Sequence, residues 1–199
     1  QRPFGGRRAY RETHLTALRG VIEVALTKEV AHLVYLSALG VSMNSGAAYA
    51  ETKAAAEASL ARSGLSWTIV SPSILFGHGS EIITAFDLLS RLPLLPMPRI
   101  EATVRPIHVD DAAEAIAEAL LSDIPAKRLA LVGPERLSFT EVARAYLEHR
   151  GVRLMLLPKQ ISKLLIDLAS PLKLPGLPSE ISQMLTIDNA GSPPEDPEG

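Results

Sequence analysis

Two residues four positions apart, Tyr49 and Lys53, carry the clearest chemical signal in the sequence. They lie in SGAAYAETKAAAEASLARSG (45–64), which Ser45 can cap and Gly64 can end, so the stretch predicts one helix. Residues i and i+4 share a helix face. An ammonium beside a phenol lowers the phenol pKa from its usual value of about 10, and such a phenol can exchange a proton with a carbonyl or an alcohol. Because the lysine can also bond the hydroxyls of a ribose, the pair suits hydride transfer with a nicotinamide cofactor.

The surroundings of the pair separate a catalytic helix from an ordinary alanine-rich surface helix. The spacing alone is weak, since it arises by chance in roughly one such chain in eight. The helix, however, follows a short apolar run, LVYL (33–36), that predicts a strand buried on both faces and ends at Ser37. A second apolar run leads into SPSILFG (71–77). In a parallel α/β sheet, both strand ends present residues to a ligand at the same edge.

The order of elements around the pair predicts half of a doubly wound parallel α/β sheet. Apolar residues recur at helical spacing in 12–28, ahead of the first strand. The second strand is expected at Trp67–Val70, and Pro72 terminates it. The connections between the strands are long enough for right-handed crossovers.

The rest of the chain predicts a small C-terminal α/β region interleaved with this core. Ser138 and Glu141 have capping-box spacing at the start of one helix. The expected elements are a helix running into a proline-rich loop (80–96), a short strand and a helix (104–122), a strand (128–133), a helix (138–151), a strand (152–158), and amphipathic helices at 159–174 and 178–187. The apolar faces of the last two helices suit either core packing or docking to a partner complex.

The composition excludes several classes of function. A net charge of −2 over 199 residues argues against a nucleic-acid-binding surface. The absence of cysteine rules out disulfides and thiolate chemistry and indicates a reducing compartment. The five histidines show no metal-ligand spacing, and no apolar run reaches the roughly 18 residues that a membrane span needs.

Four motifs in a fixed order carry a family resemblance: HLVYLSALG (32–40), YAETK (49–53), TIVSPSILFG (68–77) and RPIHVDDAAEAI (105–116). Together they resemble the extended or atypical branch of the short-chain dehydrogenase/reductase superfamily, the NAD-dependent epimerase/dehydratase group. Within that group, LVGPERLSFTEVA (131–143) and LTIDNAG (185–191) look most like the NAD(P)H-binding accessory subunit of respiratory complex I and its bacterial relatives. The resemblance covers about residues 10–190.

The resemblance implies a role for each matching residue. Tyr49 would be the catalytic acid/base, Lys53 would hold the cofactor ribose and tune the phenol, and Ser37 would be a further catalytic residue. His108 and Asp110 would close the substrate side, with a hydrogen-bonded core histidine and a helix-capping acid as the alternatives. No metal is implied. The residues implied to bind NADP or NAD are Ser37, Ala38, Leu39, Tyr49, Lys53, Pro72, Ser73 and Ile74.

The chain departs from the family pattern in two ways. None of the 13 glycines forms the Gly-rich dinucleotide fingerprint, and the chain begins with Gln1, so we expect the C-terminal two-thirds of a family member. Leu39 stands where the family's catalytic Ser or Thr is expected, which leaves Ser37 and Ser42 as substitutes. For Ser37, a strand-end serine bonding nearby backbone is the alternative. Ser71 stands where many relatives carry an arginine.

From the resemblance we predict three segments and two alternative functions. Residues 1–77 would be the C-terminal half of a Rossmann-type NAD(P)-binding domain, 78–187 a substrate-side region, and 188–199 a disordered tail. The first function is an oxidoreductase or sugar-nucleotide epimerase/dehydratase, and the second a non-catalytic NAD(P)H-binding subunit that docks to a larger respiratory complex. The expected partners are a nicotinamide dinucleotide and a small molecule of unknown identity. The expected compartment is the cytoplasm, or the mitochondrial matrix for a eukaryotic protein.

Overall fold

A parallel three-stranded sheet forms the centre of the computed structural model, which describes residues 6–121 and 127–158. Its strands are β1 (Leu33–Leu36), β2 (Trp67–Pro72) and β7 (Lys127–Leu131), in the order β1-β2-β7. Every residue of β2 is buried, as befits a central strand rich in apolar and β-branched side chains. The predicted fold class, an α/β fold with a parallel sheet, is confirmed.

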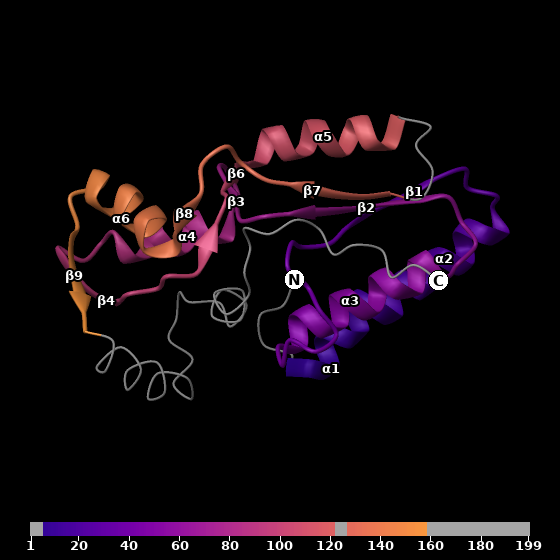
Figure 1. The fold of residues 1–199 in the computed structure, drawn as a ribbon, viewed down its shortest axis with the longest axis horizontal. Coiled ribbons are helices and arrows are strands. Elements are labelled where there is room, and N and C mark those ends of the chain that lie inside the picture. The colour runs from indigo at the N-terminus through magenta and orange to yellow at the C-terminus, as the bar shows by residue number, and fades with distance from the viewer. Residues whose placement is uncertain (1–5, 122–126, 159–199) are drawn as a thin grey trace.

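Helices cover both faces of this sheet (Figure 1). One face carries α2 (Ala17–Thr27) and α3 (Ala48–Ala61), and the other carries α5 (Val109–Leu121). The arrangement is therefore doubly wound, because the crossovers return on alternate faces. The core beneath α2 and α3 is made by Leu15, Leu18, Ile22, Ala56, Leu60, Trp67 and Ile69.

The chain reaches α2 through a short helix and a π-helical turn. Helix α1 (Gly6–Tyr10) runs directly into the π-helical segment η1 (Arg11–Thr16). The predicted helix at 12–28 is thus present, but its first turn is wider than an α-helix. His14 and Leu15 are buried from this turn, and π turns are frequent at functional sites.

A second group of elements packs at the carboxyl end of the sheet around a separate apolar core (Figure 1). Phe86, Phe139 and Leu147 are at its centre. The elements are β3 (Leu75–Phe76), α4 (Glu81–Leu89), β4 (Leu94–Pro98), β5 (Thr103–Val104), β6 (Ile107–His108), β8 (Leu137–Ser138), α6 (Phe139–His149) and β9 (Arg153–Leu157). They form the strand pairs β3–β6, β4–β9 and β5–β8.

The prediction of a proline-rich loop near residue 94 is wrong, because those residues form strand β4, paired in parallel with β9. The N–H of Arg153 donates to the carbonyl of Pro93 (3.1 Å), so the odd-numbered positions of β4 face β9. Pro96 and Pro98 therefore fall on the free edge, where a missing N–H costs no ladder hydrogen bond. Leu95 is buried in the second apolar core, so this strand packs against α4 and α6 through that residue.

Two further local predictions are corrected. The N-cap of α3 is Ala47 and not Ser45, because the Ser45 hydroxyl lies two residues upstream and accepts from the Ala47 N–H (3.2 Å). Strand β1 is not buried on both faces: it is an edge strand of this sheet, and its Leu36 is 43% exposed. Gly64 has a left-handed φ of 81° just beyond the end of α3, as its place in the sequence indicated.

The other predicted elements of the described chain are present. Ser138 caps α6 in a capping box with Glu141, whose pKa is lowered by its hydrogen bonds to Ser138. The predicted helices at 159–174 and 178–187 and the tail at 188–199 lie outside the described residues. Within the described part of the chain, none of the helices has the length and apolar character to cross a bilayer. The division of the chain at residue 77 stays a prediction.

The loop after β7 packs tightly against the β5–β6 connection. Gly133 donates its N–H to the carbonyl of Arg105 (3.0 Å), and the Arg105 side chain donates to the carbonyl of Gly133 (3.0 Å). A Cβ at Gly133 would lie 1.6 Å from the carbonyl oxygen of Pro106. Only glycine allows this approach of backbone to backbone, which ties the sheet to the second group of elements.

Gly133→Ala is therefore expected to lower the free energy of unfolding by at least about 2 kcal/mol, because backbone must move to make room. The matched control is Gly20→Ala in α2, where a Cβ meets nothing within 4 Å and should stabilise the helix by up to about 1 kcal/mol. Urea unfolding followed by the fluorescence of Trp67 measures both. Equal stabilities of the two variants would contradict the packing.

Candidate functional site

A pocket of about 350 Å³ opens at the carboxyl ends of β1 and β2. Seven of the eight predicted cofactor residues line it: Ser37, Ala38, Tyr49, Lys53, Pro72, Ser73 and Ile74. Leu39 is the exception, since it is only 2% exposed and is not part of the lining. The sequence-predicted residues thus come together in one cavity, at the edge of a parallel sheet where ligands bind.

The strand pairing continues past β1 and β2 and fixes the floor of the pocket. Ser37 donates its N–H to the carbonyl of Val70 (2.7 Å), and Leu39 donates to that of Pro72 (2.9 Å). On the far side of β2, the Ser73 N–H donates to the carbonyl of Leu131 (2.8 Å). The backbone that carries the predicted cofactor residues is therefore as ordered as the sheet itself.

Lys53 is buried, with its ammonium held against the end of β1. Its Nζ donates to the carbonyl of Leu36 (2.7 Å) and lies 5.2 Å from the centre of the Tyr35 ring. Burial lowers the pKa of Lys53 to about 8, against the opposing effect of the Glu57 carboxylate. At neutral pH the amine therefore remains largely protonated and can donate to a ligand.

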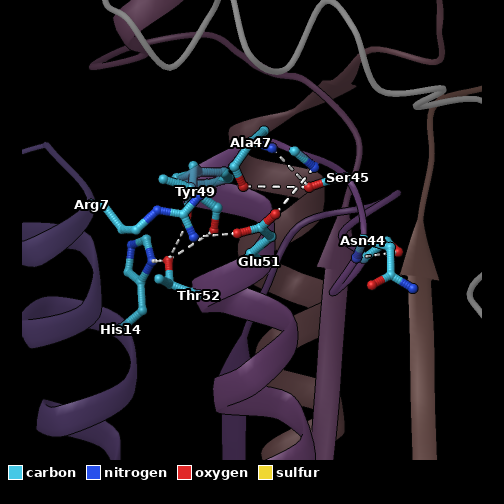
Figure 2. Close-up of polar contacts among 11 residues, drawn as sticks. Arg7, His14, Asn44, Ser45, Ala47, Tyr49, Glu51 and Thr52 are labelled. Carbon is cyan, nitrogen blue, oxygen red and sulfur yellow. Dashed lines mark hydrogen bonds and ion pairs between the residues drawn. The ribbon is translucent and has the colours of Figure 1, made fainter.

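Tyr49 lies at the start of α3 under an aromatic cover from the N-terminal helices (Figure 2). The His14 ring meets the Tyr49 ring edge-on at 5.2 Å between centroids, and Tyr10 meets it at 5.9 Å. Tyr10 and His14 also stack on each other at 5.6 Å. The phenol ring is therefore held between the first turn of α3 and these two rings.

His14 is fixed by one hydrogen bond, between its Nδ1 and the Oγ1 of Thr52 (3.0 Å; Figure 2). The single Thr52 hydroxyl proton is directed to the carbonyls of Ala48 (2.7 Å) and Tyr49 (3.0 Å), so Nδ1 of His14 must be the donor to Thr52. Burial, and then the charge of Lys53, lowers the His14 pKa to about 4. The ring is thus neutral at physiological pH.

Ser37 makes a hydrogen bond that differs from both readings of the sequence. Its Oγ donates to Oε1 of Glu57, and Oε2 of that carboxylate is paired with Arg128. The serine neither stands free in the pocket nor bonds nearby backbone through its hydroxyl. Its oxygen keeps its lone pairs, so it can accept a hydrogen bond from a ligand.

The Tyr35 hydroxyl is the one buried side-chain polar atom without a hydrogen-bond partner in the described chain. Burial, and then electrostatic interactions with Glu57 and Tyr49, raise the pKa of Tyr35. Its ring still packs against the apolar core under α3 and takes the Lys53 ammonium on its face.

The opposite wall of the pocket comes mainly from the second group of elements, and Val109 at the start of α5 completes it. Phe139 of α6 lines this wall. The Ser80 hydroxyl donates to the carbonyl of Leu75 (2.8 Å), which closes the loop between β3 and α4. The residues of this wall and rim are Leu75, His78, Gly79, Ser80, Glu81, Ile82, Val109 and Phe139. The Gly77–Gly79 stretch contributes His78 and Gly79 to the lining.

His108 and Asp110, expected on the substrate side, flank the pocket residue Val109 without lining the cavity. Nδ1 of His108 accepts from the N–H of Asp110 (3.3 Å), and the Asp110 carboxylate lies 3.5 Å away from the same ring atom. The His108 ring packs edge-on against Phe76 at 5.2 Å. Among the described residues, no group of three or more His, Cys, Asp or Glu could hold a metal ion.

Sequence reasoning missed His14, Glu57, Arg128 and Phe139. Glu57 alone carried a usable signal, because it extends the Tyr49–Lys53 spacing by another four residues on the same helix face. His14, Arg128 and Phe139 arrive from distant elements, so nothing in their local pattern indicated the pocket.

Residues 4–123 match the model of a protein family described as NAD(P)H-binding. The chain belongs to this NAD(P)H-binding family. The match includes β1, α3 and β2, which carry the predicted cofactor residues. Comparison with curated proteins gives no match.

Solved structures share the fold at low sequence identity. A double mutant of DesIV, a dTDP-glucose 4,6-dehydratase from Streptomyces venezuelae solved with NAD, is 21% identical with a TM-score of 0.61, over 77% of this chain and 56% of its own. A UDP-galactose 4-epimerase is 20% identical, with a TM-score of 0.62, over 76% of this chain and 59% of its own. RMD from Pseudomonas aeruginosa, solved with NADPH, is 15% identical, with a TM-score of 0.61, over 74% and 60%. The chain thus spans little more than half the length of these proteins.

Removing the unpartnered hydroxyl of Tyr35 should not cost stability. Tyr35→Phe is expected to leave the free energy of unfolding unchanged or to raise it by up to about 1 kcal/mol, because no hydrogen bond is lost. The control is Tyr146→Phe, which loses bonds to Asp87 (2.8 Å) and Arg150 (2.9 Å) and should cost about 0.5–1 kcal/mol. Urea unfolding compares the two, and a larger loss in Tyr35→Phe would show that its hydroxyl is paired.

His14 should make the stability depend on acid pH. Its pKa is about 4 in the folded chain against 6.5 in the unfolded one, so the unfolded state binds the extra proton between these values. The contribution of His14 to the free energy of unfolding is then complete above about pH 6.5 and falls on acidification, by about 2.5 kcal/mol at pH 4.5.

Urea unfolding across this pH range measures the effect. In His14→Phe, which keeps an aromatic ring over Tyr49, the loss of stability caused by protonation of His14 should disappear. A matched variant of an exposed histidine, His149→Gln, should retain the dependence of the wild type. Parallel pH profiles for the wild type and His14→Phe would contradict a buried, neutral His14.

Proposed function

We propose that the pocket at the ends of β1 and β2 binds a nicotinamide dinucleotide, NADP or NAD, as part of a short-chain dehydrogenase/reductase-type oxidoreductase or sugar-nucleotide epimerase/dehydratase. The observation that carries the proposal is that Tyr49 and Lys53 line one pocket with the ends of both strands. Membership of an NAD(P)H-binding family supports it. So do the cofactors of the fold's neighbours, since DesIV was solved with NAD and RMD with NADPH.

In this proposal, Lys53 and Tyr49 divide the work. Lys53 donates from Nζ to the ribose hydroxyls, and its position on the Leu36 carbonyl fixes where that ammonium lies. The Tyr49 phenol gives a proton to a substrate carbonyl oxygen, or takes one from an alcohol. The bound nicotinamide supplies or accepts the hydride.

The remaining cofactor contacts come from the strand ends. Ala38 follows β1, and Pro72, Ser73 and Ile74 follow the line of β2. Ser37 would accept a hydrogen bond from the ligand rather than donate one, because its proton is directed to Glu57. His14 and Tyr10 would shield Tyr49 from water on the side away from the cofactor.

The second function, a non-catalytic NAD(P)H-binding subunit resembling the accessory subunit of complex I, rests on a different observation. Leu39 occupies the place of the family's catalytic Ser or Thr and is buried, and the proton of the substitute Ser37 is committed to Glu57. A site of this kind retains the lysine for ribose binding but offers less help to a substrate oxygen. Such a subunit would dock to a larger respiratory complex.

Titration of NADH and NADPH, followed by nicotinamide fluorescence, tests the binding. Lys53→Ala is expected to weaken binding at least about tenfold, because the ribose loses a charged donor. Lys28→Ala is the matched control: this exposed lysine follows α2 and should leave the affinity unchanged. Binding by the wild type that survives intact in Lys53→Ala would contradict the proposed site.

Tyr49→Phe separates the two functions. In the enzyme, this variant keeps its affinity for the dinucleotide but loses turnover of carbonyl or alcohol substrates, because it has no proton to give. In the binding subunit, wild type and variant bind alike and neither turns over substrates in a screen of sugar nucleotides and small carbonyl compounds.

A further inference from the structure

Three residues stand on one face of α3 at intervals of four: Tyr49, Lys53 and Glu57. The last of these has no place in the function proposed above, yet it is only 4% exposed. Both oxygens of its carboxylate are engaged, one by the hydroxyl of Ser37 and the other by the guanidinium of Arg128. These partners come from the end of β1 and from β7, so one side chain joins three elements.

Stability alone does not account for the buried Glu57–Arg128 pair, because desolvation of two charges offsets much of their attraction. Apolar residues of similar volume could fill the same space. The second contact of Glu57 suggests a different role. Its carboxylate accepts a hydrogen bond from the Ser37 hydroxyl, and the preceding residue, Leu36, accepts one from Lys53 Nζ at its carbonyl (2.7 Å). Lys53 and Glu57 therefore hold adjacent residues of the same strand end.

We propose that Glu57 is a positioning residue for the Tyr49–Lys53 pair, which fixes the strand end beneath Lys53 and supplies the buried negative charge that keeps its ammonium protonated for a ligand. This inference rests on the proposed function for the identity of the ligand. Arg128 in turn orients the carboxylate and stacks over Trp67, 5.9 Å from the ring centre to its guanidinium carbon. Tyr49 and Lys53 touch the ligand in this scheme, whereas Glu57 acts through them.

The electrostatic surroundings of Lys53 agree with this geometry. The groups facing it are His14 from η1, Tyr35 from β1, and Tyr49 and Glu57 from its own helix, with Arg128 of β7 behind Glu57. His14 is neutral, and the pKa of Tyr35 is raised, so neither carries a charge near neutral pH. Glu57 is thus the carboxylate that opposes the effect of burial on the pKa of Lys53.

The test is the titration of the Lys53 amine by NMR in full-length protein with labelled lysine, using the signal that vanishes in Lys53→Ala. The wild-type midpoint is expected at about pH 8. Glu57→Gln should lower it by about one pH unit, because the amine loses its counter-charge. Glu51→Gln is the control, because Glu51 lies on the same helix but is paired with Arg7. This variant should leave the Lys53 midpoint unchanged.

Binding of NADPH gives a second readout that a purely structural role would not move. With the midpoint lowered by one pH unit, the protonated fraction of Lys53 at about pH 7.5 falls about threefold, and affinity should fall with it. At about pH 6 both proteins are protonated, so the affinity of Glu57→Gln should recover. A loss of affinity that is equal at both pH values would overturn the electrostatic role.

Glu57→Gln removes the carboxylate from the buried Arg128 guanidinium and can unfold the chain, so Glu57→Gln/Arg128→Met is included, which removes both charges. Its Lys53 midpoint should also fall. An unchanged midpoint in either folded variant overturns the proposal. If the wild type binds no dinucleotide, the proposed function fails, while a midpoint that falls in Glu57→Gln still supports the role of Glu57.

Discussion

The parallel pairing between the ends of β1 and β2 is the constraint on which the pocket depends. The ladder does not stop where the strands do, because Ser37 and Leu39 still bond to β2 backbone. That extension sets the spacing between the two strand ends. Lys53, reaching down from α3 to the Leu36 carbonyl, locks the helix to the same point. Hydrogen bonds therefore join the helix to the strand ends that line the pocket.

The polar groups beneath the pocket are arranged so that few net charges are buried. Glu57 and Arg128 neutralise each other, and His14 is kept uncharged by burial. Among the lining residues from the ends of β1 and β2 and from α3, Lys53 is the charged one at neutral pH, with Glu81 on the opposite wall. In a site of low dielectric, a well-placed ammonium acts on a ligand more strongly than it would in water.

Local patterns in the sequence predicted the strands, the helix with Tyr49 and Lys53, and the edge at which they meet. These features follow from short apolar runs, helical periodicity and turn residues, all of which are local. The proline-bearing strand β4 was missed, because proline argues against a strand until the free edge is known. Arg128 was missed for another reason: it meets Glu57 across 71 residues of sequence, a contact that only the β2–β7 pairing creates.

That β2–β7 pairing also has a consequence for how the chain folds during synthesis. Strand β2 is complete at residue 72, but its second partner spans Lys127–Leu131, after α4, β4 and α5 have been made. Until then a wholly buried strand has one open edge, which is a template for pairing with other chains. The Glu57 carboxylate likewise has no ion pair with Arg128 until β7 has been made. The central sheet and the Glu57–Arg128 pair beneath its pocket are therefore both completed late, by the same strand, β7.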